Sequence, residues 1–441
     1  MLKKKFISFY VQYKRIFALA APLILFNMLQ NFYNLADTYF MGKLGGIELT
    51  TASFTTPITQ MIIGIGSGFS IGGGIIISQL YGKKDLKKLL ETSTQLLIIN
   101  IILSTLIMFL AFIFCNNILE FSGATGELLA KSSIYIKFIF ITIPLTFIVN
   151  TYTTINNCKG QTIAPLYIIL YSVIANIILN AIFIYKFKMG LFGIGLATVI
   201  ANIILSFYCL VELKRKKEID FSYLKFKINI FFKILKLGIP ISLSTATNSL
   251  SFVIVNIFVV KYGNEVLAAY GIGNRINGII YVLINGIGSA IAILVGQNIG
   301  ARKLKKAKAI VFHGMIIGIF LGILAIIFLY FTLENIIGTL TNDESIKYHT
   351  TNYVLIMLAS IIPWVIFQVL SGVFQGTGHT KFNMYCHFGR VWFFRIPFIY
   401  FFEKILEAKE FSIWYSMLLS NLCALLFSFI LYKNINWNKK I

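Results

Sequence analysis

Residues 92–115 read TSTQLLIINIILSTLIMFLAFIFC, a run of 24 residues that contains no charged side chain. An α-helix of this length rises about 36 Å, and the hydrocarbon core of a bilayer is about 30 Å thick. The same composition extends along the chain, because 58% of its 441 residues are hydrophobic and only 12% are charged. Soluble domains carry about 25% charged residues. The sequence therefore predicts a membrane protein and nearly excludes a soluble enzyme.

Eleven similar runs, each bounded by charged residues, Gly or Asn, bring the predicted transmembrane helices to twelve. The twelve runs cover residues 16–40, 51–79, 92–115, 132–157, 164–185, 192–213, 230–260, 265–297, 308–332, 348–375, 382–402 and 411–432. Several exceed the length that a bilayer requires, so we expect those helices to tilt or to extend beyond the hydrocarbon. The predicted fold class is an all-α polytopic membrane protein.

The chain has 39 Lys and Arg against 16 Asp and Glu, a net charge of +23 that would also suit a nucleic-acid binder. If the N-terminus lies inside and the runs alternate, inside segments hold 25 basic residues and outside segments hold 8. Cytoplasmic loops of membrane proteins are enriched in Lys and Arg. The charge therefore predicts that both termini are cytoplasmic, and no nucleic-acid partner is expected.

The two halves of the chain repeat at a constant shift of 218 residues. The shift aligns Pro22 with Pro240, Gly45 with Gly263, and Gln79, Gly82, Leu86, Lys87 and Lys88 with Gln297, Gly300, Leu304, Lys305 and Lys306, and also Gly160 and Thr162 with Gly378 and Thr380. Each half has an even number of runs, so both enter the membrane from the same side, as parallel repeats do. We therefore predict two pseudo-symmetric six-helix lobes, an N-lobe of residues 1–213 and a C-lobe of residues 230–441, joined by a cytoplasmic linker of residues 214–229.

Asp37 is the one acidic residue that lies well inside an apolar run. A carboxylate in a membrane helix is costly and marks a functional site by default. Polar neighbours or a bound cation would stabilise its charge, which is the chemistry of a proton- or sodium-coupled site. The alternative is that Asp37 lies near water at the outer end of the first span and only caps or hydrogen-bonds.

On a helix, the residues three, four and seven positions before Asp37 share its face. These residues are Asn34, Tyr33 and Gln30. The fifth run adds Asn176 and Asn180, four positions apart, and buried amides in a membrane require partners. Ordinary hydrogen bonding between helices is the alternative for this pair. The fourth run contributes Tyr135 and Asn150.

The second half has no Asp or Glu at a comparable depth. Its polar residues inside the runs are Asn248, Asn256, Arg275, Asn277, Asn285, Gln368, Gln375, His387 and Arg390. We interpret His387 as a packing residue, with a proton relay as the alternative. Arg275 is expected to face an inner vestibule or to pair with a backbone carbonyl.

Small residues in the apolar runs predict packing rather than chemistry. The second run is rich in glycine, and we expect close packing against a neighbouring helix. The five cysteines show no paired spacing, so we interpret them as small apolar residues rather than as disulfides or metal ligands.

Several motifs match those of one family of transporters. They are APLILFNMLQNFYNLADTYFMGKLGG at 21–46, ISQLYGKKD at 77–85, NIILNAIFIYKFKMGLFGIGLATVI at 176–200, LAAYGIGNRINGIIY at 267–281, LVGQNIGARK at 294–303 and FQGTGHTK at 374–381. In order and spacing they resemble the multidrug and toxic compound extrusion (MATE) family along the whole chain. The resemblance implies two lobes around a central cavity, and export by alternating access driven by a proton or sodium gradient.

The family's cation site in the N-lobe carries over onto Asp37, Asn176, Asn180 and Thr198. Many members have Asp where this chain has Asn180, which leaves Asp37 as the only titratable ligand. Some members also carry C-lobe carboxylates, which this chain lacks, so a C-lobe cation site is not expected. The cavity residues that we expect near the substrate are Gln30, Tyr33, Asn34, Tyr135 and Asn150.

The resulting hypothesis is a proton- or sodium-coupled antiporter that exports amphipathic, cationic organic compounds. It would be a monomer among lipids in the cytoplasmic membrane of a prokaryote. We expect no cofactor besides the coupling ion, and no metal other than sodium at Asp37. The alternative is a flippase for a lipid-linked or polar precursor. A membrane-embedded enzyme is disfavoured because no HExxH, GxGD or clustered Asp motif is present, and a channel because no charged ring is present.

Overall fold

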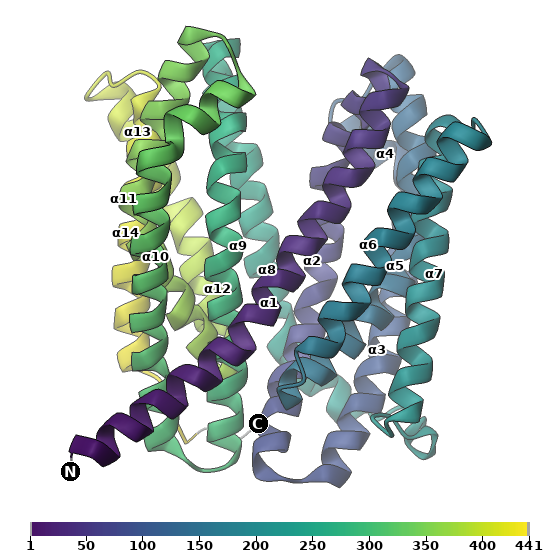
Figure 1. Ribbon diagram of the computed structural model, residues 1–441, viewed down its shortest axis with the longest axis vertical. Coiled ribbons are helices and arrows are strands. Elements are labelled where there is room, and N and C mark those ends of the chain that lie inside the picture. Colours follow the sequence, from purple (N-terminus) through teal and green to yellow (C-terminus); the bar gives the residue numbers. More distant parts are fainter. Residues whose placement is uncertain (1, 439–441) are drawn as a thin grey trace. The chain divides into compact units, whose positions relative to one another are not determined.

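The computed structural model describes residues 2–438, and this part of the chain is helical without strands. In chain order the elements are α1 (Leu2–Leu44), α2 (Gly46–Lys83), α3 (Leu86–Ile113), α4 (Cys115–Phe121), α5 (Gly126–Lys159), α6 (Ile163–Ala181), η1 (Ile182–Lys186), α7 (Gly190–Arg215), η2 (Phe221–Tyr223), α8 (Ile228–Val259), η3 (Val260–Tyr262), α9 (Asn264–Gly300), α10 (Leu304–Leu340), α11 (Glu344–Gly376), α12 (Thr380–Phe388), η4 (Gly389–Arg395), α13 (Ile396–Lys404) and α14 (Phe411–Lys433) (Figure 1). The elements η1 and η4 are π-helical, and η2 and η3 are 3-10 turns. The predicted inside residues Lys439 and Lys440 lie outside the described residues, as do the side chains of Lys3, Lys4 and Lys5.

Within the described residues, eleven helices are long and apolar enough to cross a membrane. The twelfth predicted span is the continuous helix formed by α12, η4 and α13. Two arginines, Arg390 and Arg395, lie in this helix and make it less hydrophobic than the other eleven. The fold is the predicted all-α membrane protein with twelve spans.

The backbone confirms the repeat at a shift of 218 residues. Lys84 and Arg302 both adopt the left-handed conformation, with φ of 62° and 57°, and Gly160 and Gly378 do so with φ of 85° and 73°. The same shift relates the first residues of three helix pairs, which are Gly46 and Asn264, Leu86 and Leu304, and Gly126 and Glu344. The two halves therefore end and restart their helices with the same local geometry.

The contacts divide the chain into two compact units. The N-unit comprises residues 25–245, and the C-unit comprises the residues up to Ile24 together with those from Ala246 onward. The boundaries fall inside α1 and inside α8, so the first helix of each repeat begins in the unit built mainly from the other repeat. The lobes of residues 1–213 and 230–441 assigned from the sequence stay a prediction.

In the N-unit, α5 packs against α2, α3 and α7 (Figure 1).

Glycines allow α8 to approach α2 closely. A Cβ added to Gly68 would lie 2.5 Å from the backbone nitrogen of Ser242. A Cβ added to Gly72 would lie 2.8 Å from the backbone nitrogen of Gly238. Real Cβ atoms do not approach other atoms so closely, so the predicted close packing of this glycine-rich span is confirmed.

The segment between α7 and α8 is fixed to the rest of the N-unit. The amide of Gln95 in α3 donates to the carbonyl oxygens of Tyr223 and Lys225 at 2.7 and 2.9 Å, and accepts from the backbone nitrogen of Lys227 at 2.9 Å. Glu218 forms an ion pair with Lys159 at the end of α5. The predicted linker is therefore held against the ends of α3 and α5.

In the C-unit, α9 packs against α10 and α11, and α11 also packs against α14 (Figure 1). Aromatic side chains fill this core, including Trp414, which stacks on Tyr270. Asp343 caps α11 by accepting hydrogen bonds from the backbone nitrogens of Ser345 and Ile346 at 2.9 and 3.2 Å. Within the described residues four of the five cysteines are buried, and none forms a disulfide.

One short helix, α4, is not predicted from the apolar pattern. It follows directly on the third span, where Phe114 leaves the helical conformation. Its Cys115 and Leu119 are buried in a cluster with Phe140 and Phe147 of α5. The segment thus packs against α5 through two of its apolar side chains.

Candidate functional site

Asp37 is buried in the N-unit, with 6% of its surface exposed. The Nδ2 atom of Asn180 in α6 donates a hydrogen bond to its Oδ1 at 2.8 Å. The hydroxyl of Thr198 in α7 donates to its Oδ2 at 3.3 Å and shares its hydrogen with the carbonyl oxygen of Ile194 at 3.0 Å. Each carboxylate oxygen therefore has one neutral donor, and each donor comes from a different helix.

Asn176 connects these donors to a tyrosine one helical turn before Asp37. Its Oδ1 accepts a hydrogen bond from Asn180 at 3.1 Å, and its Nδ2 donates to the Tyr33 hydroxyl at 3.1 Å and to Thr198 Oγ1 at 3.5 Å. Spacing of four residues places both asparagines on one face of α6, as the sequence predicts. The structure thus brings all four residues assigned to the cation site together.

Two features of this site suit the binding of a cation. The Oδ1 atom of Asn180 is buried and has no hydrogen-bond partner among the described residues. Within the same part of the chain, no Lys or Arg forms an ion pair with Asp37. Because an ionised carboxylate only accepts hydrogen bonds, Asn180 turns its nitrogen toward Asp37 and its oxygen away. The site therefore offers oxygens without a positive charge, and hard cations prefer such ligands.

Of the five residues predicted to line a substrate cavity, the structure brings Tyr33 and Tyr135 together in the N-unit. Gln30 and Asn34 are exposed on α1, whereas Tyr33 belongs to the hydrogen-bonded network around Asp37. Tyr135 lies close enough to Asp37 and Tyr33 to interact electrostatically with both, and it packs in an apolar cluster that also contains Phe40, Met41, Ala52, Ile139, Ile184 and Ile194. Asn150 is half-buried fifteen residues farther along α5, which is about 22 Å along a helix. The structure thus separates Asn150 from Tyr135, and the assignment of all five residues to a substrate cavity stays a prediction.

One further polar residue adjoins the network. Asn202 donates from its amide to the carbonyl oxygen of Thr198 at 2.8 Å. Neither the apolar pattern nor the family motif marks Asn202, although its position four residues after Thr198 places it on the same face of α7.

In the C-unit, His387 is buried and its Nδ1 lies 3.1 Å from Oδ1 of Asn248. Its ring meets Phe367 edge-on, with the ring centroids 5.1 Å apart. Both contacts are those of a packing residue. Arg275 is exposed on α9.

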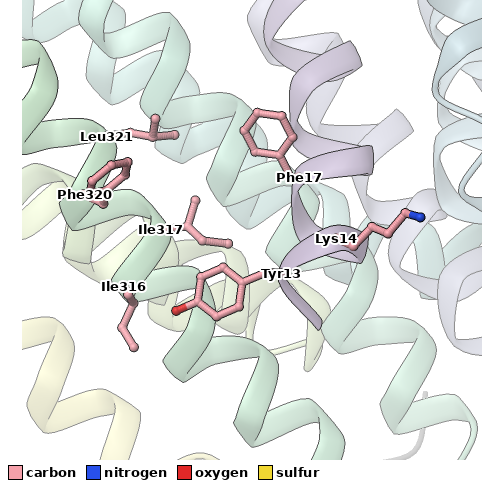
Figure 2. Close-up of a pocket in the computed structure, with 7 residues that line it drawn as sticks. All are labelled: Tyr13, Lys14, Phe17, Ile316, Ile317, Phe320 and Leu321. Carbon is pink, nitrogen blue, oxygen red and sulfur yellow. The ribbon is translucent and has the colours of Figure 1, made fainter. Parts of the chain in front are cut away.

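A cavity of about 620 Å³ lies between α1 and α10 in the C-unit. It is lined by Tyr13, Lys14, Phe17, Ile316, Ile317, Phe320 and Leu321. Figure 2 shows apolar side chains of both helices converging, with the Lys14 amine directed away from them. None of the residues predicted for a site lines this cavity, and its walls suit hydrocarbon rather than an ion.

Known proteins resemble this chain over most of its length. The chain is 28% identical to the multidrug export protein MepA of Staphylococcus saprophyticus, over 84% of this chain and 82% of MepA. It is 26% identical to the probable multidrug resistance protein YoeA of Bacillus subtilis, over 95% of this chain and 93% of YoeA.

Solved structures share the fold. An outward-facing multidrug resistance MATE family transporter superimposes with a TM-score of 0.91 and 21% identity, over 98% of this chain and 97% of that one. A transporter of the MOP superfamily from Pyrococcus furiosus superimposes with a TM-score of 0.90 and 21% identity, over 96% and 95% of the two chains.

The family model MatE matches twice, at residues 22–182 and 240–401. The two matches begin 218 residues apart, which is the shift of the internal repeat. Together they cover more than half of the chain. The chain therefore belongs to the MATE family of multidrug efflux transporters.

Proposed function

We propose that this chain is a proton- or sodium-coupled antiporter that exports amphipathic organic cations, with Asp37 as the residue that binds the coupling ion. The observation that carries the proposal is the buried Asp37 carboxylate, which has two neutral donors and no cationic partner among the described residues. A charge removed from water without a counter-charge is costly, so such a group gains by taking up a proton or a sodium ion.

Binding of the ion would drive export by a shift between conformations. The ion enters from the outside, binds at Asp37 and favours the state that releases the substrate, and it leaves toward the cytoplasm when the transporter returns. Coupling of this kind requires that the two states bind the ion with different affinity. The relatives named as multidrug export proteins support an organic substrate, and the excess of basic residues in the predicted inside segments supports cytoplasmic termini. We place the protein, as a monomer among lipids, in the cytoplasmic membrane of a prokaryotic cell.

The proposal is tested in proteoliposomes loaded with a fluorescent cationic dye. We expect dye movement when either a pH gradient or a sodium gradient is imposed, and comparing the two gradients identifies the ion. Asp37→Asn should abolish gradient-driven movement while the protein remains folded, whereas Asn31→Ala, at an exposed amide of α1, should retain it. Full transport by Asp37→Asn would reject Asp37 as the coupling residue. Transport of a lipid-linked precursor without any dye transport would favour the flippase instead.

A further inference from the structure

Two arginines of the helix α12–η4–α13, Arg390 and Arg395, are buried inside the C-unit. Only 7% of Arg390 and 4% of Arg395 is exposed. Buried arginines are rare in membrane spans, and their guanidinium groups stay protonated. We call these two residues the arginine pair. The C-unit therefore encloses two positive charges that the proposed antiport mechanism does not use.

Neutral oxygens are the partners of Arg395. Its Nη1 donates to the Ser251 hydroxyl at 2.7 Å, its Nε donates to the Ser420 hydroxyl at 3.2 Å, and its Nη2 donates to Oδ1 of Asn421 at 3.3 Å. These bonds hold the group in place but leave its charge uncompensated.

Arg390 has the same kind of surroundings. Its Nη2 donates to Oδ1 of Asn248 at 2.6 Å, and its Nη1 donates to the same Asn421 oxygen that Arg395 uses, also at 3.3 Å. The ring of Trp364 lies against the guanidinium, 4.7 Å from ring centroid to Cζ. The two guanidinium groups are thus close enough to share one acceptor atom.

No negative charge balances the arginine pair within the described residues. The ion pairs of the C-unit join Lys261 to Glu403, Lys347 to Glu344 and His349 to Glu410, and none involves an arginine. The Nε–H of Arg390 is buried and has no hydrogen-bond partner in this part of the chain. An unpaired buried donor on a charged group is costly, so this atom marks where a partner is missing.

His387 adds a donor to the cluster rather than a negative charge. A guanidinium only donates, so the Asn248 atom that faces Arg390 is its oxygen. The Nδ1 of His387 lies 3.1 Å from that same oxygen and must therefore carry the hydrogen. All the described groups around the arginine pair are thus neutral or positive.

We propose that the arginine pair binds a small inorganic anion of the size of chloride, which contacts the Nε–H of Arg390 and balances the two guanidinium charges. The low exposure of both side chains and the Trp364 ring against Arg390 favour an ion of one atom over an organic carboxylate. The proposal involves none of the residues of the Asp37 site and does not depend on the coupling ion.

The first test is thermal unfolding of the full-length protein in detergent, with chloride or bromide exchanged for gluconate at constant ionic strength. A ligand that binds only the folded state raises the unfolding temperature in a saturable way. We expect chloride and bromide to raise the unfolding temperature by about 3 °C or more. Arg390→Met should lose the effect. Arg275→Met, the same substitution at an exposed arginine of the C-unit, should keep it.

Two further measurements cover the case in which Arg390→Met does not fold. Arg390→Lys keeps a positive charge but lacks the Nε–H, and we expect it to require at least tenfold more chloride for half of the effect. Crystals of the wild-type protein grown with bromide should show an anomalous peak in contact with Arg390 Nε. An equal chloride effect in Arg390→Met, stabilisation by acetate but not by halides, or no bromide at the arginine pair would each overturn the proposal.

Discussion

Asn180 donates a hydrogen bond to Asp37 over 2.8 Å, although 143 positions separate the two residues in the sequence. The other hydrogen of the same amide group goes to Asn176 at 3.1 Å, so the orientation of the amide is fixed from two sides. Its oxygen is thereby left buried and without a partner among the described residues. The arrangement keeps an acceptor available beside a carboxylate, which is what an arriving cation requires.

Replacing Asn180 by Ala should change the ion affinity of Asp37, because Oδ1 of Asp37 loses the hydrogen bond that stabilises its charge. Hydrogen bonds to charged groups contribute about 1.5–3 kcal/mol, which corresponds to a change in ion affinity of about tenfold or more. We expect the ion concentration for half-maximal dye transport to change by the same factor of about tenfold or more. Asn202→Ala removes an amide that neighbours Thr198 and Tyr33 but makes no hydrogen bond to the Asp37 carboxylate, and it should leave this concentration within about twofold of the wild type. Equal effects of the two variants would contradict the assigned role of Asn180.

Thr198→Val should have a smaller effect on the same measurement. The substitution keeps the shape of the side chain and removes the hydroxyl that donates to Oδ2 of Asp37 at 3.3 Å. This bond is longer than that of Asn180 and shares its hydrogen with the Ile194 carbonyl oxygen at 3.0 Å, so a shift of about two- to fivefold is expected, or roughly 0.5–1 kcal/mol. Thr198→Ser retains a hydroxyl and should restore coupling. A Ser variant as impaired as the Val variant would indicate that packing, and not the hydrogen bond, is what Thr198 supplies.

The parts of the site that lie on one helix can be predicted from the sequence. Spacing alone places Tyr33 with Asp37, and Asn176 with Asn180, because one helix fixes their relative direction. That Thr198 joins them follows from the family resemblance, because periodicity does not specify which faces of two helices meet. Asn150 shows the limit, since it is polar and intramembrane but lies far along α5 from Tyr135.

The same distinction holds for the fold. Uninterrupted apolar runs and a constant repeat shift predict the spans and their pairing, because both are properties of the sequence pattern itself. The π-helical segment η4 leaves no such trace. Residues five apart point about 140° from each other on an α-helix, so Arg395 is not expected beside Arg390. Hydrogen bonds that span five residues, as in a π-helix, place the two side chains on nearly the same face.

The contacts of Gln95 predict that Gln95→Ala loosens the segment between α7 and α8. The substitution removes three hydrogen bonds to backbone groups of residues 223–227. At about 1 kcal/mol each, the free energy of unfolding should fall by about 3 kcal/mol. Limited proteolysis of this segment should also accelerate. Gln161→Ala, at an exposed glutamine of the same unit, should change neither quantity, and an intact segment in Gln95→Ala would show that other contacts suffice to hold it.

The close approach of α2 and α8 predicts that Gly68→Ala destabilises the N-unit. The added Cβ would lie 2.5 Å from the backbone nitrogen of Ser242 and 2.8 Å from its Cα, and backbone atoms cannot yield as the end of a side chain can. The two helices must therefore separate, and overpacking of this kind costs about 1–3 kcal/mol. We expect a lower unfolding temperature and less folded protein in membranes.

Gly46→Ala is the matched control in the same helix, because nothing lies within 4 Å of its added Cβ. Alanine is the better helix former by about 0.5–1 kcal/mol, so this control should be neutral or stabilising. If both variants were equally stable, the close approach of α8 to α2 would not depend on the missing side chain at Gly68.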